Sequence, residues 1–183
     1  MRVETIQTER LYLRPFERTD ARFAISIWND KEMGQYLLDE AMEEISDEYL
    51  RMIEDLAEDT ECYYMIAEHR ETQERIGTCS FLLSEDGTTM DIAYCVLKKL
   101  WRNGYATEMA RGMVDYAKTH GIEKITISIA KDNVASNGVA RKLGCICKEE
   151  KLCTKQGTEE PHTVYRYELD ITQNSKTKTE ETL

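Results

Sequence analysis

The hydrophobic pattern of this chain changes just past its middle, and that change constrains the fold more than any other feature. Before it, apolar residues predict three strands, over 62–68, 75–83 and 89–97. The dipeptide Asp86-Gly87 separates the second and third strands and is typical of a tight hairpin turn. After the change, apolar residues recur at helical spacing over 104–120. A meander followed by alternating helices and strands predicts an α+β domain around one mixed, largely antiparallel sheet.

Weaker signals complete the order of elements. Ser46 is typical of a helix N-cap, and Gly121 and Gly144 are typical of helix ends. The further elements that we expect are a strand over 11–16, a short helix through Phe23–Trp28, a helix from Ser46, a strand over 122–130, a helix over 133–143, and strands over 145–153 and 162–169. We therefore expect one domain over 1–170, followed by a polar, frayed tail over 171–183.

The composition argues against several classes of function. The 183 residues include 24 Lys and Arg against 35 Asp and Glu, a net charge of −11, whereas nucleic acids and anionic membranes need a basic surface. No apolar run approaches the ~18 residues of a membrane span, and the first residues lack the apolar stretch of a secretory signal, so we expect a cytoplasmic protein. The six cysteines contain no C-x-x-C pair and the three histidines stand apart. We therefore expect reduced thiols and no metal site.

One turn has the chemistry of an anion site. The sequence Trp101-Arg102-Asn103-Gly104-Tyr105-Ala106-Thr107 joins the strand of 89–97 to the helix of 104–120. A helix N-terminus presents unpaired N–H groups and a partial positive charge, and glycine lets an anion approach the backbone, so this turn can hold a pyrophosphate. The segment 98–142 carries nine cations and four anions, a net +5, while the remainder carries −16. The alternatives are a glycine that merely opens a helix and chance clustering of charge on solvated faces.

A second polar group follows the strand of 122–130. Asn133 stands where it can cap the next helix, and Ser136 falls in the first turn of that helix. Arg141 and Lys142 lie in its last turn. Capping and solvent exposure account for these residues without any ligand.

Taken together, these segments resemble the GNAT superfamily of N-acetyltransferases. The resemblance rests on the strand Asp91–Leu97, the turn 101–108, the pair Asn133-x-x-Ser136 and the run Lys142-Leu143-Gly144, in this order. The opening Thr8-Glu9-Arg10-Leu11-x-Leu13-Arg14-Pro15 is similar to the ribosomal-protein (RimJ/RimL-like) N-terminal acetyltransferase branch. The family implies acetyl-CoA as donor, an amine as acceptor, and a sheet that splays apart at a bulge beside the donor.

The resemblance also implies a role for each residue. The pyrophosphate would be held by Arg102, Asn103, Gly104, Tyr105, Ala106 and Thr107, and the pantetheine arm would pair with Cys95, Val96 and Leu97. Asn133 would meet the pantetheine from the side, and Arg141 or Lys142 would reach a phosphate. Ser136 would protonate the leaving thiolate, and Asp91 would take a proton from the amine directly or through water. A backbone amide near Leu97 would polarise the thioester carbonyl.

The sequence departs from the common family pattern in three ways. Trp101 stands where Gln or Arg is usual, and tryptophan there is common in the ribosomal-protein branch. Asp91 and Ala93 stand where that branch often has Glu and Gly, and the shorter aspartate favours a contact through water or a plain solvent-facing role. Ala140 stands where many members carry a tyrosine acid, so that role cannot be filled there, and Ser136 matches the serine that the ribosomal-protein branch uses.

The choice of acceptor depends on how weak this base is. A peptide α-amine, with a pKa of about 7.7–8.0, needs up to ~1.4 kcal/mol to become neutral near pH 7, whereas lysine needs roughly 4–5 kcal/mol. We therefore expect the N-terminal α-amine of a ribosomal or other protein as the acceptor. The alternatives are a small amine, such as a polyamine or aminoglycoside, and a non-catalytic acyl-CoA-binding module. Acidic residues over 39–48 could attract a cationic acceptor or form a solvated helix face, and both a monomer and a homodimer stay open.

Overall fold

The fold is that of a single eight-stranded sheet flanked by four helices, seen in a computed structural model that describes residues 4–37, 42, 44–154 and 161–172. The strands are β1 (Ile6–Gln7), β2 (Leu11–Pro15), β3 (Cys62–His69), β4 (Arg75–Leu83), β5 (Thr89–Val96), β6 (Lys124–Ala130), β7 (Ile146–Thr154) and β8 (Pro161–Asp170). The helices are α1 (Ala21–Trp28), α2 (Asp47–Asp55), α3 (Tyr105–Thr119) and α4 (Val134–Leu143), with 3-10 turns at Arg18–Asp20, Leu56–Glu58 and Lys98–Leu100. The predicted α+β class and order of elements are confirmed, and β1 is an addition that the sequence did not reveal.

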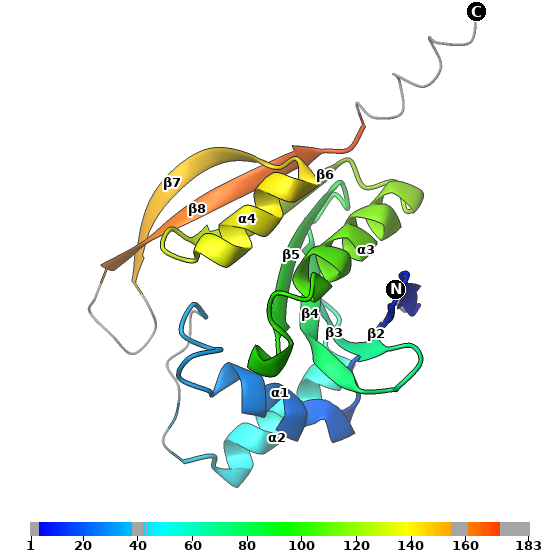
Figure 1. The fold of residues 1–183 in the computed structure, drawn as a ribbon, viewed down its shortest axis with the longest axis vertical. Helices are drawn as coiled ribbons and strands as arrows, with labels where there is room; N and C mark the ends of the chain where they lie inside the picture. Colours follow the sequence, from blue (N-terminus) through cyan, green and yellow to red (C-terminus); the bar gives the residue numbers. More distant parts are fainter. Residues whose placement is uncertain (1–3, 38–41, 43, 155–160, 173–183) are drawn as a thin grey trace, which may run out of the picture.

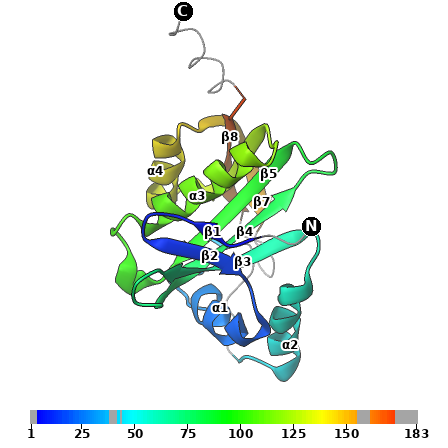
Figure 2. The same ribbon diagram turned by 90° about the vertical axis from the view of Figure 1, so that its right-hand side faces the viewer.

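The sheet is mixed, with a single parallel junction among the described strands. Its order is β1-β2-β3-β4-β5-β6-β8-β7, and every neighbouring pair is antiparallel except β5 and β6. Helices α3 and α4 cover one face, and α1 and α2 cover the other (Figures 1 and 2). The main core lies under α3 and α4, where Met109 and Met113 of α3 pack fully buried against strand residues such as Ile92 and Ile125.

The parallel junction is short, and this shapes the centre of the molecule. Strands β5 and β6 pair only over Thr89–Asp91, the last pair being Asp91 with Thr126. Beyond it, β5 stays with β4 and β6 stays with β8, because each has a full antiparallel partner on its outer side. The predicted splay is therefore present. The predicted bulge is wrong for this strand, since β4 and β5 pair from Gly77↔Val96 to Leu83↔Met90 without a register shift.

The local signals for helix ends are confirmed by the backbone. Ser46 accepts a hydrogen bond from the Tyr49 amide at 3.0 Å and so caps α2. Gly121 and Gly144 have φ values of +74° and +88°, the left-handed conformation that ends a helix. Ile171, where we expected the tail to begin, is buried, and its amide donates to the Glu123 carbonyl at 2.9 Å. The rest of the expected tail, from 173 on, lies outside the described residues.

Candidate functional site

The opening between β5 and β6 exposes one edge of β5. In an antiparallel pair, alternate residues turn their backbone N–H and C=O groups toward the partner strand. The Leu97 amide donates to the Ile76 carbonyl at 2.9 Å, so the odd-numbered residues of β5 bond to β4. The even-numbered residues Ile92, Tyr94 and Val96 therefore direct their N–H groups into the opening. The amide of Leu97 itself is engaged by β4, so the amide near Leu97 that is directed into the opening is that of Val96.

The C-terminal end of β5, next to the opening, is held by contacts with the following turn and with β4. The Trp101 indole donates to the Val96 carbonyl at 2.7 Å, which ties the end of β5 to the turn before α3. The Cys95 side chain lies beside Thr78 of the neighbouring strand β4, away from the opening. Burial raises the pKa of the Cys95 thiol to about 11. Of the three residues predicted to pair with the donor, Val96 alone thus turns its backbone into the opening.

Tyr94 supplies an unsatisfied group beside the opening. Its hydroxyl is buried and has no hydrogen-bond partner among the described residues. Burial raises the pKa of Tyr94 to about 12, and the neighbouring Ser136 side chain of α4 opposes that rise without being in hydrogen-bonding geometry. Leaving a buried hydroxyl unpaired costs about 1–3 kcal/mol, so the pair Tyr94 and Ser136 marks a place where a ligand atom or water is expected.

The turn before α3 has the backbone of an anion site. Gly104 is the N-cap residue of α3, has a φ of +82° and provides no side-chain cap. The first backbone bond of the helix runs from the Glu108 amide to the Gly104 carbonyl at 3.0 Å. The amides of Tyr105, Ala106 and Thr107 therefore lack acceptors within the helix. Arg102 also has a positive φ, +64°, a conformation that is uncommon outside glycine.

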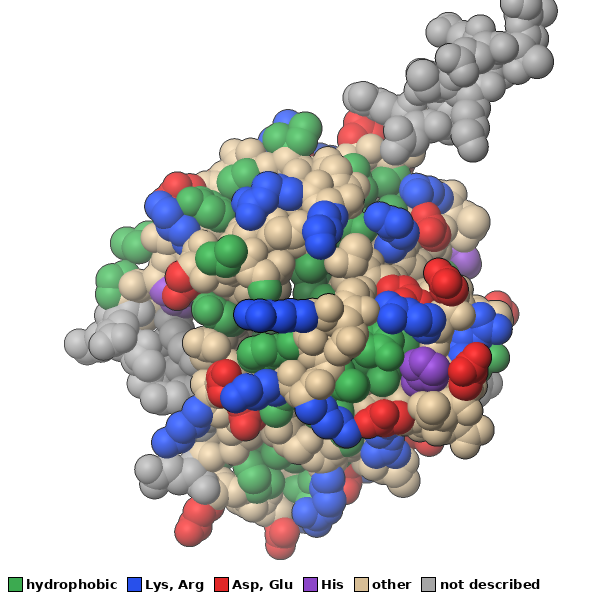
Figure 3. All heavy atoms as spheres, in the orientation of Figure 1, with side chains coloured by type: hydrophobic (Ala, Val, Ile, Leu, Met, Phe, Trp, Pro, Cys, Tyr) green, Lys and Arg blue, Asp and Glu red, His purple; other side chains and the backbone are tan. Residues whose placement is uncertain are grey.

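Ion pairing narrows the predicted basic segment to a few cations. Lys98 pairs with Glu32 and Lys99 pairs with Glu74, so these two cations next to the turn are neutralised by other parts of the chain. The cations of 98–142 that have no ion pair among the described residues are Arg102, Arg111, Arg141 and Lys142. Lys and Arg side chains lie over the face that carries α3 and α4 (Figure 3). Of the nine cations in segment 98–142, these four are therefore the ones whose positive charge is not balanced by an ion pair among the described residues.

A groove brings two of these free cations to the turn. It has a volume of about 870 Å³ and runs along α3 beside β1, and Gly104, Thr107, Arg111 and Lys142 all line it. Arg141 points elsewhere, toward the Tyr167 hydroxyl of β8, whose pKa is raised by burial and held back by Arg141. Of the two residues predicted to reach a phosphate, Lys142 is therefore the one that lines this groove beside the turn.

The N-terminus of α4 is built by two asparagines. The Asn133 side chain accepts from the Ser136 amide at 3.1 Å, so its oxygen serves as the helix cap. Asn137, one turn later, is 3% exposed; it donates to the Ala130 carbonyl at 3.0 Å and accepts from the Tyr167 hydroxyl at 2.8 Å. These bonds fix α4 against the end of β6, and thereby fix the position of Ser136.

Asp91 lies on the opposite sheet face from α3, at the point where β5 and β6 part. It accepts a short hydrogen bond from the Thr126 hydroxyl, and Arg166 Nη1 lies 4.0 Å from the same oxygen. Its side chain is 41% exposed. Ser136 lies on the α4 side, so the two predicted catalytic residues approach the opening from different faces of the sheet.

Three residues of this site were not predicted from the sequence. Arg111 lies one helical turn after Thr107, and this spacing alone could have placed it on the face of the turn. Tyr94 and Asn137 carry no local signal, because their roles depend on packing against α4, β6 and β8.

Two further features of the described residues bear on alternative functions. In the ranges that the structure describes, no group of three or more His, Cys, Asp or Glu side chains is arranged to hold a metal ion. Within the same ranges, none of the helices is long and apolar enough to cross a membrane.

Comparisons with known proteins agree with the geometry. The family model described as the acetyltransferase (GNAT) domain matches residues 10–146. An uncharacterised N-acetyltransferase of Bacillus subtilis is 31% identical over 76% of this chain and 81% of its own length. An uncharacterised N-acetyltransferase of Bacillus licheniformis is 29% identical over 73% of this chain and 78% of its own length.

Solved structures share the fold at lower sequence identity. A GNAT-family acetyltransferase from Bacillus anthracis superposes with a TM-score of 0.79 at 20% identity, covering 91% of this chain and 98% of that one. A spermidine N-acetyltransferase from Vibrio cholerae, solved with CoA and spermine, gives 0.77 at 18% identity, covering 88% and 95%. A ribosomal-protein α-N-acetyltransferase, RimL, solved with CoA, gives 0.75 at 20% identity, covering 92% and 98%. The opening beside β5, the glycine turn and these matches together show that the chain belongs to the GNAT family and is an N-acetyltransferase that uses acetyl-CoA.

Proposed function

We propose that this N-acetyltransferase acts on the α-amine of a protein N-terminus. The observation that carries the proposal is the charge around Asp91. Its carboxylate is bonded to Thr126 and has Arg166 at 4.0 Å, and Glu168, on the same sheet face, pairs with Lys124 at 3.5 Å. These two carboxylates are thus each balanced by a cation, which suits an acceptor with one weakly basic amine better than a polyamine with several ammonium groups.

The residues present fit acetyl-CoA. The amides of Tyr105 to Thr107, with the free cations Arg102, Arg111 and Lys142, would hold its phosphates. The inner edge of β5 is open to pair with the pantetheine, and the Tyr94 hydroxyl, which has no hydrogen-bond partner in the described part of the chain, lies beside that edge. When bound, acetyl-CoA supplies the activated acetyl group.

The chain's own groups would divide the remaining work. The Val96 amide, directed into the opening, would donate a hydrogen bond to the acetyl carbonyl oxygen. The Ser136 hydroxyl, held at the start of α4 by the Asn133 cap, would give its proton to the leaving sulfur. Asp91 would accept the proton of the amine, through a water because its near oxygen is engaged by Thr126.

The acidic segment expected to attract the acceptor is only partly in view. Asp39, Glu40 and Glu43 lie outside the described residues. Glu44, Asp47 and Glu48 are exposed around the start of α2, which lies on the same side of the sheet as Asp91. These carboxylates would draw a cationic N-terminus toward the site from a distance and need not contact the reacting amine.

An acceptor screen at saturating acetyl-CoA tests the proposal, with released thiol as the readout. The arms are peptides with free α-amines, the same peptides with a blocked N-terminus and one lysine, and spermidine. Turnover confined to free α-amines supports the proposal. Faster turnover with spermidine would establish the small-amine alternative, whose supporting observation is the spermine bound in the Vibrio cholerae relative of the same fold. Tight CoA binding without turnover in any arm would identify a binding module.

A further inference from the structure

The N-terminal motif Thr8–Pro15 has contacts that the catalytic roles leave unused. Thr8 and Arg10 lie in the turn between β1 and β2, and both reach Glu108 in the first turn of α3. Glu108 Oε1 accepts from Thr8 Oγ1 and from the Arg10 amide, each at 2.7 Å, and Oε2 accepts from Arg10 Nε at 2.7 Å. The Glu108 side chain is 15% exposed, so this is a sheltered junction between segments 98 residues apart.

The far end of Arg10 continues onto the glycine turn. Its Nη1 and Nη2 both donate to the Asn103 carbonyl at 3.1 Å, and its guanidinium stacks over the Tyr105 ring at 4.4 Å from the centroid. One side chain therefore contacts the residues on both sides of Gly104.

The geometry of the peptide bond gives this contact a consequence for Gly104. In a trans peptide the C=O and N–H groups point in opposite directions. Holding the Asn103 carbonyl toward Arg10 therefore turns the Gly104 N–H away from it. Arg102, which precedes Asn103, has a φ of +64°, a conformation that a residue other than glycine keeps only where the surroundings enforce it.

We propose that Arg10, anchored by Glu108, is a positioning residue that sets the shape of the phosphate-binding turn and thereby the affinity for CoA. The proposal rests on the assignment of the turn 102–107 to the pyrophosphate. It gives the motif Thr8-x-Arg10 a physical purpose, because Thr8 fixes Glu108 and Glu108 orients Arg10.

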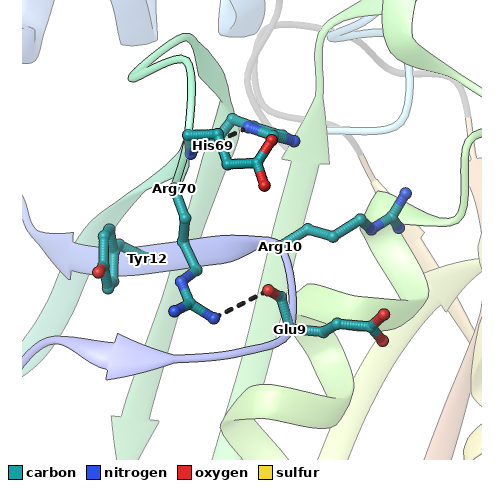
Figure 4. A pocket seen from close by; sticks show the side chains of 6 residues that line it. Glu9, Arg10, Tyr12, His69 and Arg70 are labelled. Atoms are coloured by element: carbon teal, nitrogen blue, oxygen red, sulfur yellow. Dashed lines mark hydrogen bonds between the residues drawn. The ribbon is translucent and has the colours of Figure 1, made fainter.

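A second arginine, Arg70 in the connection between β3 and β4, contacts the same β1–β2 turn and provides a matched control. Arg70 Nη1 donates to the carbonyls of Thr8 and Glu9 at 2.9 Å each, and its guanidinium lies over the Tyr12 ring. Figure 4 shows Arg70 bonded to Glu9, while Arg10 extends away from it. Arg70 thus braces the β1–β2 turn, and among the described residues it makes no hydrogen bond to the glycine turn.

The test compares Arg10→Lys and Arg70→Lys by calorimetric binding of CoA and of pantetheine, which lacks the pyrophosphate. Lysine keeps the charge but cannot bridge Glu108 and the Asn103 carbonyl at once. Arg10→Lys should weaken CoA binding about tenfold and leave pantetheine binding unchanged, whereas Arg70→Lys should change neither. The melting temperature of each variant shows whether it is folded.

The outcomes distinguish the positioning role of Arg10 from the assignment of the turn 102–107 to the pyrophosphate. Unchanged CoA affinity in Arg10→Lys, or an equal loss for CoA and pantetheine, would overturn the role of Arg10. If Gly104→Glu also leaves CoA affinity unchanged, the pyrophosphate assignment itself fails.

Discussion

Asp91 and Thr126 form the last pair between β5 and β6, and their side chains are hydrogen-bonded at the point where the two strands separate. This pair places a carboxylate at the apex of the opening that we assign to the donor. It also limits the carboxylate, because one oxygen is already engaged and Arg166 lies 4.0 Å from it. A base held in this way suits an amine that is already partly neutral.

Asp91→Asn should lower kcat/KM for an α-amine acceptor near pH 7 and leave CoA affinity unchanged. The loss should fade toward pH 9, because an amine with a pKa of about 7.7–8.0 is then neutral without a base. Pre-steady-state or steady-state rates between pH 6.5 and 9 measure this. Glu168→Gln is the control, since Glu168 lies on the same sheet face and pairs with Lys124. A rate profile for Asp91→Asn that overlies the wild type at every pH would remove Asp91 from the mechanism.

Gly77→Ala should destabilise the protein and weaken CoA binding. A Cβ atom at Gly77 would lie 2.0 Å from the Cys95 carbonyl oxygen, a backbone atom of β5 that cannot move without displacing the strand. We expect a loss of about 1–3 kcal/mol in the free energy of unfolding, as for other overpacked sites. Denaturant unfolding and CoA calorimetry measure the two effects.

Gly138 of α4 offers the matched substitution. Its added Cβ would meet no atom within 4 Å, so Gly138→Ala should stabilise the helix by about 0.5–1 kcal/mol. If Gly77→Ala and Gly138→Ala give the same unfolding free energy and CoA affinity, close packing of β4 on β5 is not what holds β5 in place.

Local features of the sequence were sufficient for some parts of this site and insufficient for others. Gly104 and Ser46 could be placed from sequence because a helix end is specified within a few residues. The sequence could not show whether the Val96 or the Leu97 amide is directed into the opening, because this depends on which edge of β5 bonds to β4. The contact of Arg10 with Glu108 joins segments that no short-range pattern connects.

Ser136→Ala should lower kcat for acetyl transfer by more than it changes the KM for acetyl-CoA. The α4 cap is formed by the Ser136 amide and the Asn133 side chain, so removal of the hydroxyl leaves the helix start intact. Asn133→Ala is the contrasting variant and should cost about 1 kcal/mol of stability through loss of the cap. Steady-state kinetics and thermal unfolding distinguish the two. An unaltered kcat in Ser136→Ala would leave Ser136 as a helix-start residue only.

The acid stability of the protein should depend on Glu108. Burial acts to raise the pKa of Glu108, but hydrogen bonds from Thr8 and Arg10 outweigh it, and the net pKa is lowered. The folded state therefore binds this proton less readily than the unfolded state, where the pKa is about 4.3. The stabilisation is complete above about pH 5 and is lost as the pH falls through the folded-state pKa. Glu108→Gln should show a shallower fall in unfolding free energy below pH 5, and curves that stay parallel to the wild type would contradict this.

Gly104→Glu should abolish CoA binding while the protein stays folded. The substitution places a carboxylate where we expect the pyrophosphate, and it forces a non-glycine residue into a φ of +82°. The strain alone is reproduced by Gly121→Glu, because Gly121 has a φ of +74° and no atom lies within 4 Å of its added Cβ. Calorimetry with CoA, with melting temperatures alongside, should therefore show similar destabilisation of both variants and loss of binding in Gly104→Glu alone. CoA affinity that falls equally in both would mean that strain, and not contact with the phosphates, explains the loss.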